Sequence, residues 1–238
     1  MGMRPSELFH LFGDLNNLSG IGPKTAINLK NLSIEKPRDF LFNLPFSVLD
    51  RLPVSSIRGV PASKIVTVEV LVKAHKIGRS RASAHRVTVQ DTEVSFQLVF
   101  FNARKEYLEN LFPVGERRII SGKLEFYDNI PQIVHPHHVK KINEEKAIVR
   151  FEPVYPLTSG VSQKLMFGTI NGLLEKLPKL GEWIDHELLK IKGWPSWQDA
   201  LKSAHCPVSA DGASNTNPAR LRLAFDELFS HQLSLSIA

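Results

Sequence analysis

A run of alternating apolar and polar residues between positions 65 and 139 constrains the fold of this chain more than any other feature. Five segments in it have the period of two that is typical of half-buried strands. They are 65–74, 86–91, 93–102, 117–127 and 130–139. A helical pattern at 103–112 lies between the third and the fourth. Five strands with a helix in that place are the order of an OB-fold, so we expect a five-stranded OB-fold β-barrel.

The third strand candidate ends in an aromatic pair. Alternation puts Phe100 on the apolar face and Phe101 on the opposite, more polar face, where Asn102 ends the strand. An aromatic ring exposed at a strand end can stack on a flat partner. We therefore expect Phe100 to anchor the barrel and Phe101 to meet a ligand.

Basic residues accumulate between the first two strand candidates. No acidic residue lies between Glu69 and Asp91. The same stretch carries five basic residues, which are Lys73, Lys76, Arg79, Arg81 and Arg86. In an OB-fold this is the 1-2 loop, and a basic loop can follow a phosphate backbone. The alternative is a solvated basic loop without a ligand.

The loop between the fourth and fifth strands offers a second set of candidates. Lys123, Tyr127 and Asn129 lie on that side of the expected barrel, and Tyr127 would give a second stacking surface. The alternative is a tyrosine that only occupies the tip of a hairpin.

Composition favours a polyanionic partner. The 238 residues include 30 Lys and Arg against 24 Asp and Glu, which gives a net charge of +6 and a pI of about 9.4. Nucleic acid is the partner that this charge and its clustering indicate, although lysines that serve solubility give the same total. The single cysteine, Cys206, fits a reducing cytoplasmic setting. No apolar run is long enough to span a membrane, so we expect no membrane contact.

Residues 6–34 contain two short amphipathic segments around a glycine pair. Gly20 and Gly22 flank Ile21, Pro23 suits the first turn of a helix, and Lys24 follows. The pattern resembles a helix-hairpin-helix element, in which backbone N–H groups meet a DNA phosphate. The alternative is a helical hairpin that serves packing alone.

Catalytic and metal sites are not expected. His135, His137 and His138 suggest a metal, but no carboxylate or cysteine stands at a helpful spacing. No Ser/His/Asp order or carboxylate pair stands out either.

The rest of the chain divides into connectors and helices. Residues 35–64 are rich in proline and read as a connector, and the segments 165–177, 183–191 and 198–205 have helical patterns. The last segment, from 219, puts Leu221, Phe225, Leu228 and Phe229 on one side and Arg222 elsewhere, and its missing cap suggests a truncated chain. We expect an α+β multidomain chain with a helical segment 1–60, a barrel 61–146 and a helical linker 147–238.

Taken in order, short motifs along nearly the whole chain resemble those of the RecG branched-DNA helicases, in the region before their motor. The motifs are 18–24 (LSGIGPK), 42–45 (FNLP) leading to Asp50 and Arg51, 99–102 (VFFN) with Tyr107 and Leu108 beyond, Gly122 with Lys123, His135 with Pro136, 153–156 (PVYP) with Gly160, His205 with Pro207, and 222–228 (RLAFDEL). One departure is Thr92 after Asp91, where the family often has a glycine, so we expect a differently built turn.

The resemblance implies an OB-fold wedge that binds a stalled fork or a Holliday junction and splits parental from nascent strands, in DNA repair and recombination. It makes Phe101 the leading residue for stacking on bases, with Phe100 and Asn102 beside it and Tyr107 as a second. A two-lobed motor would follow. Because no Walker A pattern occurs in these residues, we expect ATP and Mg²⁺ to bind only in that motor, and this chain to bind branched DNA without unwinding it.

Further expectations are a monomer in the bacterial cytoplasm, associated with the nucleoid, and a single-strand-binding protein as a second partner. Two other functions stay open at this point. One is a general module for single-stranded nucleic acid or RNA, and the other is a platform for protein interactions.

Overall fold

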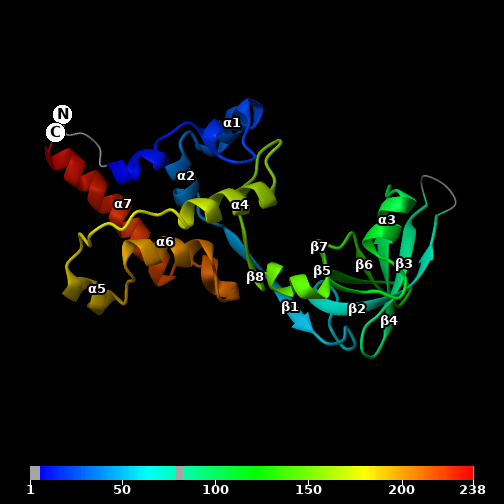
Figure 1. Ribbon diagram of the computed structural model, residues 1–238. Helices are drawn as coiled ribbons and strands as arrows, with labels where there is room; N and C mark the ends of the chain where they lie inside the picture. The colour runs from blue at the N-terminus through cyan, green and yellow to red at the C-terminus, as the bar shows by residue number, and fades with distance from the viewer. Residues whose placement is uncertain (1–5, 79–82, 238) are drawn as a thin grey trace. The chain divides into compact units, whose positions relative to one another are not determined.

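The computed structural model describes residues 6–78 and 83–237. They form two compact units, one built from Met1–Val48 with Phe151–Ala238 and the other from Leu49–Arg150. We call them the helical unit and the barrel unit, and the ribbon in Figure 1 shows the elements of each.

The barrel unit is a closed five-stranded barrel. Its strands are β2 (Ile65–Lys76), β3 (His85–Gln90), β4 (Ser95–Phe100), β5 (Arg117–Tyr127) and β6 (Ile130–Val134). They pair in the order β2-β3-β4-β6-β5, and β5 closes the ring by pairing with β2. Only β4 and β6 are parallel within this ring. Helix α3 (Lys105–Leu111) lies between β4 and β5 in the sequence. The expected OB-fold barrel and its helix are confirmed.

Alternating valines explain why β2 forms the centre of this barrel. Val66, Val68, Val70 and Val72 are each at most 1% exposed, and the residues between them are exposed or half-buried. β-branched side chains at this period suit a pleated strand with one buried face.

Two expectations about this region are wrong in detail. The proline-rich connector 35–64 contains helix α2 (Pro37–Phe42) and strand β1 (Ser47–Val54), which pairs in parallel with β2. Proline begins α2 and lies inside β1 at Pro53, so it does not mark a loop at either place. The fifth strand candidate is divided into β6 and β7 (His138–Lys140), because His135 has a φ of +44° and Pro136 follows it. A 3₁₀ turn, Ile142–Ala147, comes after β7.

The turn between β3 and β4 is built around a buried carboxylate. Asp91 is 8% exposed and accepts hydrogen bonds from the backbone N–H groups of Glu93, Val94 and Ile57, each at 2.8 Å, and from the Ser56 hydroxyl at 3.1 Å. Burial opposes ionisation of Asp91, but the hydrogen bonds outweigh it and hold its pKa below the ordinary value. The side chain of Asp91 thus shapes this turn, and Thr92 can follow it without a glycine at that position.

The helical unit consists of short helices and one short strand. They are the 3₁₀ segments Ser6–Leu11, Leu15–Asn17, Lys30–Leu32 and Ala210–Ala213, the helices α1 (Pro23–Leu29), α2, α4 (Gln163–Leu174), α5 (His186–Lys192), α6 (Trp197–His205) and α7 (Pro218–Ile237), and β8 (Phe151–Val154). The polar stretch 209–218 includes one of these 3₁₀ turns.

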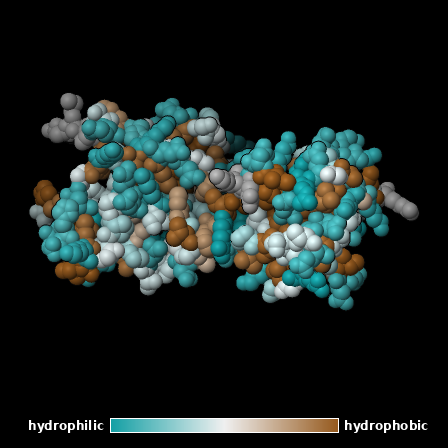
Figure 2. Space-filling model, turned by 60° about the horizontal axis from the view of Figure 1, so that its bottom comes forward, coloured by the Kyte–Doolittle hydropathy of each residue, from teal (hydrophilic) through white to brown (hydrophobic). Residues whose placement is uncertain are grey.

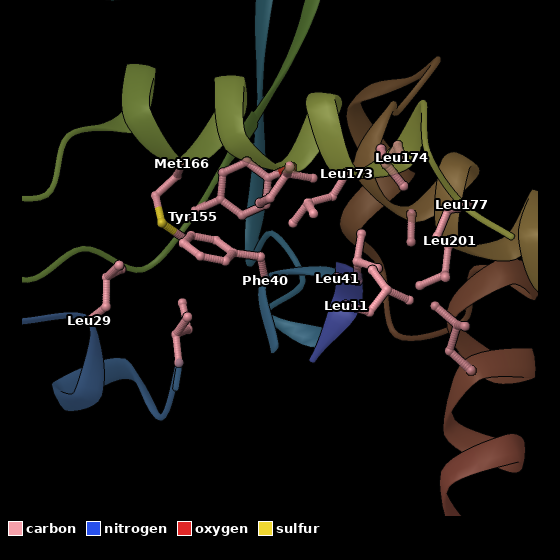
Figure 3. Packing of buried hydrophobic residues seen from close by; sticks show 14 of the residues in the cluster. Leu11, Leu29, Phe40, Leu41, Tyr155, Met166, Leu173, Leu174, Leu177 and Leu201 are labelled. Atoms are coloured by element: carbon pink, nitrogen blue, oxygen red, sulfur yellow. The ribbon is translucent and has the colours of Figure 1, made fainter. Parts of the chain in front are cut away.

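One core holds the helical unit together. Phe40 from α2, Tyr155 after β8 and Met166 from α4 are each at most 1% exposed, and Figure 3 shows them pointing toward one another. The same cluster includes Leu11 near the start of the chain and Leu201 in α6. The expected segments 1–60 and 147–238 therefore contribute to the same core.

A buried histidine joins three segments of this unit. Nε2 of His205 lies 2.9 Å from the Leu41 carbonyl, so it carries the proton, and Nδ1 accepts from the Tyr155 hydroxyl at 3.0 Å. The imidazole is fully buried, and burial lowers its pKa to about 4. Burial likewise raises the pKa of Tyr155. Both rings are therefore neutral at physiological pH.

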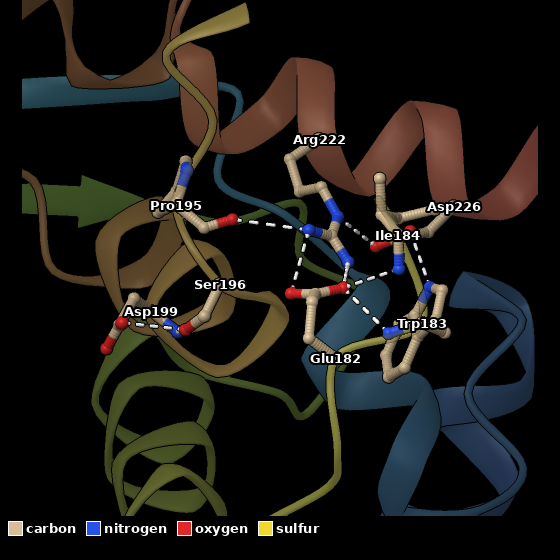
Figure 4. Close-up of polar contacts among 8 residues, drawn as sticks. All are labelled: Glu182, Trp183, Ile184, Pro195, Ser196, Asp199, Arg222 and Asp226. Atoms are coloured by element: carbon tan, nitrogen blue, oxygen red, sulfur yellow. Dashed lines mark hydrogen bonds and ion pairs between the residues drawn. The ribbon is translucent and has the colours of Figure 1, made fainter. Parts of the chain in front are cut away.

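Helix α7 leaves most of its expected apolar side exposed and buries Arg222 instead. Leu221, Leu228 and Phe229, expected on its apolar side, are 43%, 65% and 42% exposed, whereas Arg222 is fully buried. Figure 4 shows the reason, since Arg222 points at the carboxylates of Glu182 and Asp226. A buried charge that is paired and hydrogen-bonded can replace an apolar side chain in the interior.

Candidate nucleic-acid interface

The end of the barrel where β4 stops brings together residues from three other strands. Strand register pairs Lys76 with Arg86, Arg86 with Val99, and Val99 with Val134. The basic residues Lys76 and Arg86 therefore lie level with Val99 in β4, two residues before Phe101. Arg79 and Arg81, in the loop between these strands, lie outside the described residues.

The two phenylalanines at the end of β4 differ in burial, as expected. Phe100 is 7% exposed and packs against Phe112 with ring centroids 5.6 Å apart, while Phe101 is 49% exposed. The predicted division between an anchoring and an exposed ring is confirmed. Val99, which alternation puts on the same face as Phe101, is also buried, at 2% exposed.

A hollow of about 670 Å³ lies beside Phe101. It is lined by Phe100, Phe101, Asn102, Ala103, Arg104, Tyr107, Leu111, His135, Pro136, His137 and Val139. Tyr107 is 60% exposed on α3, and Asn102 has a φ of +55°, which turns the chain sharply between β4 and α3. The exposed rings of Phe101 and Tyr107 and the guanidinium of Arg104 thus border one hollow, a set that suits stacking on bases beside a phosphate backbone.

His135 supports the backbone of Phe101. Its Nε2 accepts a hydrogen bond from the Phe101 N–H at 3.1 Å, and its ring contacts those of Phe100 and Phe101. The sequence suggests a metal role for His135 and a motif shared with Pro136, but it gives no sign of this contact. Among the described residues, no group of three or more His, Cys, Asp or Glu side chains is arranged to hold a metal ion. Only the pairing of β4 with β6, which no local pattern reveals, brings His135 to Phe101.

A buried arginine lies behind the same turn. Arg51 in β1 is 3% exposed, and its Nη1 lies 3.1 Å from the Ser121 hydroxyl and 3.2 Å from Nδ1 of His137. Gly122 lies next to this turn, and a Cβ there would come within 2.4 Å of Ile133. His137 is therefore held by a buried arginine, and a Cβ at Gly122 would also lie 3.3 Å from the Cα of Pro136.

Tyr127 lies far from Phe101 along the barrel. It pairs with Ile130 at the hairpin of β5 and β6, and Gln132 lies level with Gln97 of β4. Phe101 is therefore about six residues further along the strand direction, or about 20 Å. Tyr127 is 62% exposed. Lys123 is exposed and lies 3.4 Å from Glu125, so its charge is shared with a carboxylate.

The glycine pair belongs to the helical unit. Gly20 has a φ of +80°, and a Cβ there would lie 3.1 Å from Leu165. Gly22 precedes α1 with open space around it, and Lys24 is exposed. The segment before the glycines consists of 3₁₀ turns, and α1 has seven residues. The packing role of Gly20 is visible in the structure, and a DNA contact stays a prediction.

On the face shown in Figure 2, hydrophilic side chains cover most of the surface and hydrophobic ones occur in separate patches. No helix within residues 6–78 and 83–237 has the length and apolar character that crossing a bilayer requires.

Comparisons with known proteins agree with this geometry. A solved structure of RecG bound to a three-way DNA junction matches 94% of this chain and 31% of its own, with a TM-score of 0.74 and 26% sequence identity. The ATP-dependent DNA helicase RecG of Haemophilus influenzae is 27% identical over 230 residues, which are 93% of this chain and 33% of the helicase. That of Thermotoga maritima is 27% identical over 237 residues, or 96% of this chain and 29% of the helicase.

The chain thus spans about a third of the length of these relatives. The match to a family model names the domain, whereas the pairwise matches name only the whole helicase. The model described as the RecG wedge domain matches residues 14–175, which include the five barrel strands and the helices α1, α2, α3 and α4. The chain therefore belongs to the RecG wedge domain family.

Proposed function

We propose that the barrel unit binds branched DNA and that Phe101 stacks on a base exposed at the junction. In this role the chain is the wedge of a RecG-like ATP-dependent DNA helicase that acts on replication forks or Holliday junctions in DNA repair and recombination. The wedge keeps the strands apart where they separate.

The observation that carries this proposal is the exposure of Phe101 on a rigid support. A ring that is 49% exposed would lower its free energy by burial, yet it projects from the end of a closed barrel beside Tyr107 and Arg104. A base that has lost its stacking partner at a junction offers a flat surface of the same kind.

Charge supports the same ligand. Lys76 and Arg86 lie level with Val99, two residues before Phe101 in β4. No acidic residue occurs between Glu69 and Asp91. Contacts of lysine and arginine with phosphates give affinity without sequence preference, and they weaken as salt rises. A junction is defined by its shape, so such contacts suit it.

A competition experiment tests the proposal. The 238-residue chain is titrated with a three-way junction, with a duplex of equal length and with a single strand, and dissociation constants are measured by fluorescence anisotropy. We expect the junction to bind tightest and Phe101→Ala to weaken it about tenfold, because stacking on one base contributes about 1–3 kcal/mol.

Phe42→Ala is the matched control. Phe42 has the same exposed fraction of 49% but lies at the end of α2 in the helical unit. Its replacement should leave junction binding unchanged. Equal affinity for all three DNAs would overturn the wedge function, and tightest binding to the single strand would favour a general single-strand module.

The remaining parts of the proposal concern the parent protein. We propose that ATP and Mg²⁺ bind in a motor outside these residues, because the relatives that carry the name of an ATP-dependent helicase are about three times as long. The isolated chain should then show no DNA-stimulated ATP hydrolysis. We further propose a monomer in the bacterial cytoplasm that associates with the nucleoid and with a single-strand-binding protein, which light scattering and pull-down at high salt can test.

A further inference from the structure

The backbone of Phe101 is held by a side chain where the sheet ends. The last bond of the β4–β6 ladder runs from the His135 N–H to the Val99 carbonyl, at 2.9 Å. Beyond it, the Phe101 N–H donates to Nε2 of His135 at 3.1 Å. The imidazole thus takes the place that a backbone carbonyl would hold if β6 continued.

The conformation of His135 is what allows this contact. Its φ of +44° lies in the left-handed region, which residues other than glycine rarely adopt. Pro136 follows and cannot donate to a ladder, so β6 ends here. A strained conformation of this kind persists only where the surroundings stabilise it, and such conformations cluster at functional sites.

The ring of His135 also contacts both the buried ring of Phe100 and the exposed ring of Phe101. Its centroid lies 5.7 Å from that of Phe100, at an interplanar angle of 83°, and 5.9 Å from that of Phe101, at 38°. Phe100 is in turn fixed against Phe112. The exposed ring is therefore connected to the barrel core through His135 as well as through its own backbone.

We propose that His135 is a positioning residue, which holds Phe101 in the orientation that stacks on a DNA base. This inference rests on the proposed function, because stacking by Phe101 is the event that His135 prepares. It assigns to His135 one hydrogen bond through Nε2 and one ring contact. The bond requires an unprotonated Nε2, so the proton of the neutral ring lies on Nδ1.

Three substitutions separate the bond from the ring contact. His135→Phe keeps a ring and removes the acceptor. His135→Gln provides an amide oxygen at about the position of Nε2. The side chain in His135→Asn also carries an amide oxygen, but it is too short to reach the Phe101 N–H. His186→Phe is the matched control, because His186 is exposed at the start of α5 in the helical unit.

Two readouts on the full chain follow the position of Phe101. Amide hydrogen exchange, measured by NMR, reports the Phe101 N–H without DNA. A three-way junction with 2-aminopurine at the branch reports base stacking by its fluorescence and gives the dissociation constant. We expect His135→Phe and His135→Asn to speed Phe101 exchange about tenfold and to weaken junction binding about threefold to tenfold. His135→Gln should restore most of both.

The outcomes are distinguishable. Unchanged Phe101 exchange in both His135→Phe and His135→Asn, or equal loss of binding in His135→Gln and His135→Asn, would overturn the positioning role. If Phe101→Ala itself leaves the affinity and the 2-aminopurine signal unchanged, the stacking function fails, even where exchange shows that His135 holds the backbone. Far-ultraviolet circular dichroism excludes variants that have lost the barrel.

Discussion

Nη2 of Arg222 lies 2.7 Å from Oε1 of Glu182, a residue 40 positions earlier in the chain. The guanidinium also donates to Asp226 at 2.9 Å and lies over the ring of Trp183 at 5.4 Å. Its side chain is fully buried, and those of the two acids are 15% and 12% exposed. Burial opposes ionisation of Glu182, but it is outweighed by the hydrogen bonds from Arg222 and from the backbone N–H groups of Ile184 and Trp183 together with the charge of Arg222, so the pKa of Glu182 is lowered.

Arg222→Met should destabilise the helical unit by about 3 kcal/mol. The substitution keeps the length of the side chain but leaves two carboxylates without their buried partner, which is costlier than the loss of an exposed ion pair. The three tryptophans of the chain, at 183, 194 and 197, all lie in this unit, so urea unfolding followed by tryptophan fluorescence reports it.

The control for this change is Arg58→Met. Arg58 pairs with Glu93 at 3.3 Å in the barrel unit, but the two side chains are 72% and 49% exposed. Its loss should therefore cost less than about 1 kcal/mol, measured by urea unfolding followed by far-ultraviolet circular dichroism because this unit contains no tryptophan. Equal effects of the two substitutions would contradict a structural role for the buried cluster.

The orientation of α7 could not be predicted from its own sequence. Periodicity groups Leu221 and Phe229 on one side of the helix and places Arg222 elsewhere, but it does not show which side is buried. The position of Arg222 depends on Glu182, which lies in a segment without regular structure. The sequence pattern RLAFDEL contains the arginine and one of its partners, but it gives no sign of the other.

The free energy of unfolding of the helical unit should decrease as the pH is lowered, because of the titration of His205. Burial lowers the pKa of His205 from 6.5 to about 4, so the unfolded chain takes up a proton first as the pH falls. The contribution of neutral His205 is therefore fully present above pH 6.5 and is lost progressively down to pH 4. Between pH 6.5 and pH 5 the loss should be about 2 kcal/mol.

Urea unfolding at pH 7, 6 and 5 measures this dependence. His205→Gln keeps a side-chain donor near the Leu41 carbonyl but does not titrate, so its stability should vary much less over the same range. A variant that follows the same slope as the parent chain would assign the dependence to another group.

Asp91→Ala should destabilise the barrel unit by about 3 kcal/mol. The change leaves the N–H groups of Glu93, Val94 and Ile57 without their acceptor in a buried turn. Because this unit contains no tryptophan, thermal unfolding is followed by far-ultraviolet circular dichroism, and amide exchange at the three N–H groups locates the effect.

Thr92→Gly tests the same turn from the other side. Thr92 is not among the described residues with a positive φ, so the glycine that is frequent in the family would relieve no strain here. We expect a loss of about 0.5–1 kcal/mol from the added freedom of the unfolded chain. A gain in stability would show that the backbone at Thr92 is strained.

Much of the barrel and part of the site could be predicted because their signals are local. The period of two in β2 and β4 decides which side chains face the core, and it separates Phe100 from Phe101. The support from His135 depends on a pairing between strands that are 30 residues apart in the sequence, and no local pattern encodes it. Tyr127 has the right residue type but lies at the far end of the barrel, because the direction of β6 places its hairpin there.

Substitutions of the two adjacent phenylalanines should separate stability from binding. Phe100→Ala removes a ring that is 7% exposed and packed against Phe112, so we expect it to destabilise the barrel by about 3–4 kcal/mol. Phe101→Ala removes a half-exposed ring and should change stability by less than about 1 kcal/mol, while it weakens junction binding. Thermal unfolding by circular dichroism and anisotropy titration with a three-way junction measure the two effects on the same samples. Phe100→Leu, which keeps the site apolar, should recover part of the stability and leave Phe101 in place. If instead both alanine variants unfold at similarly lowered temperatures, Phe101 contributes to the core and its exposure does not reflect a binding role.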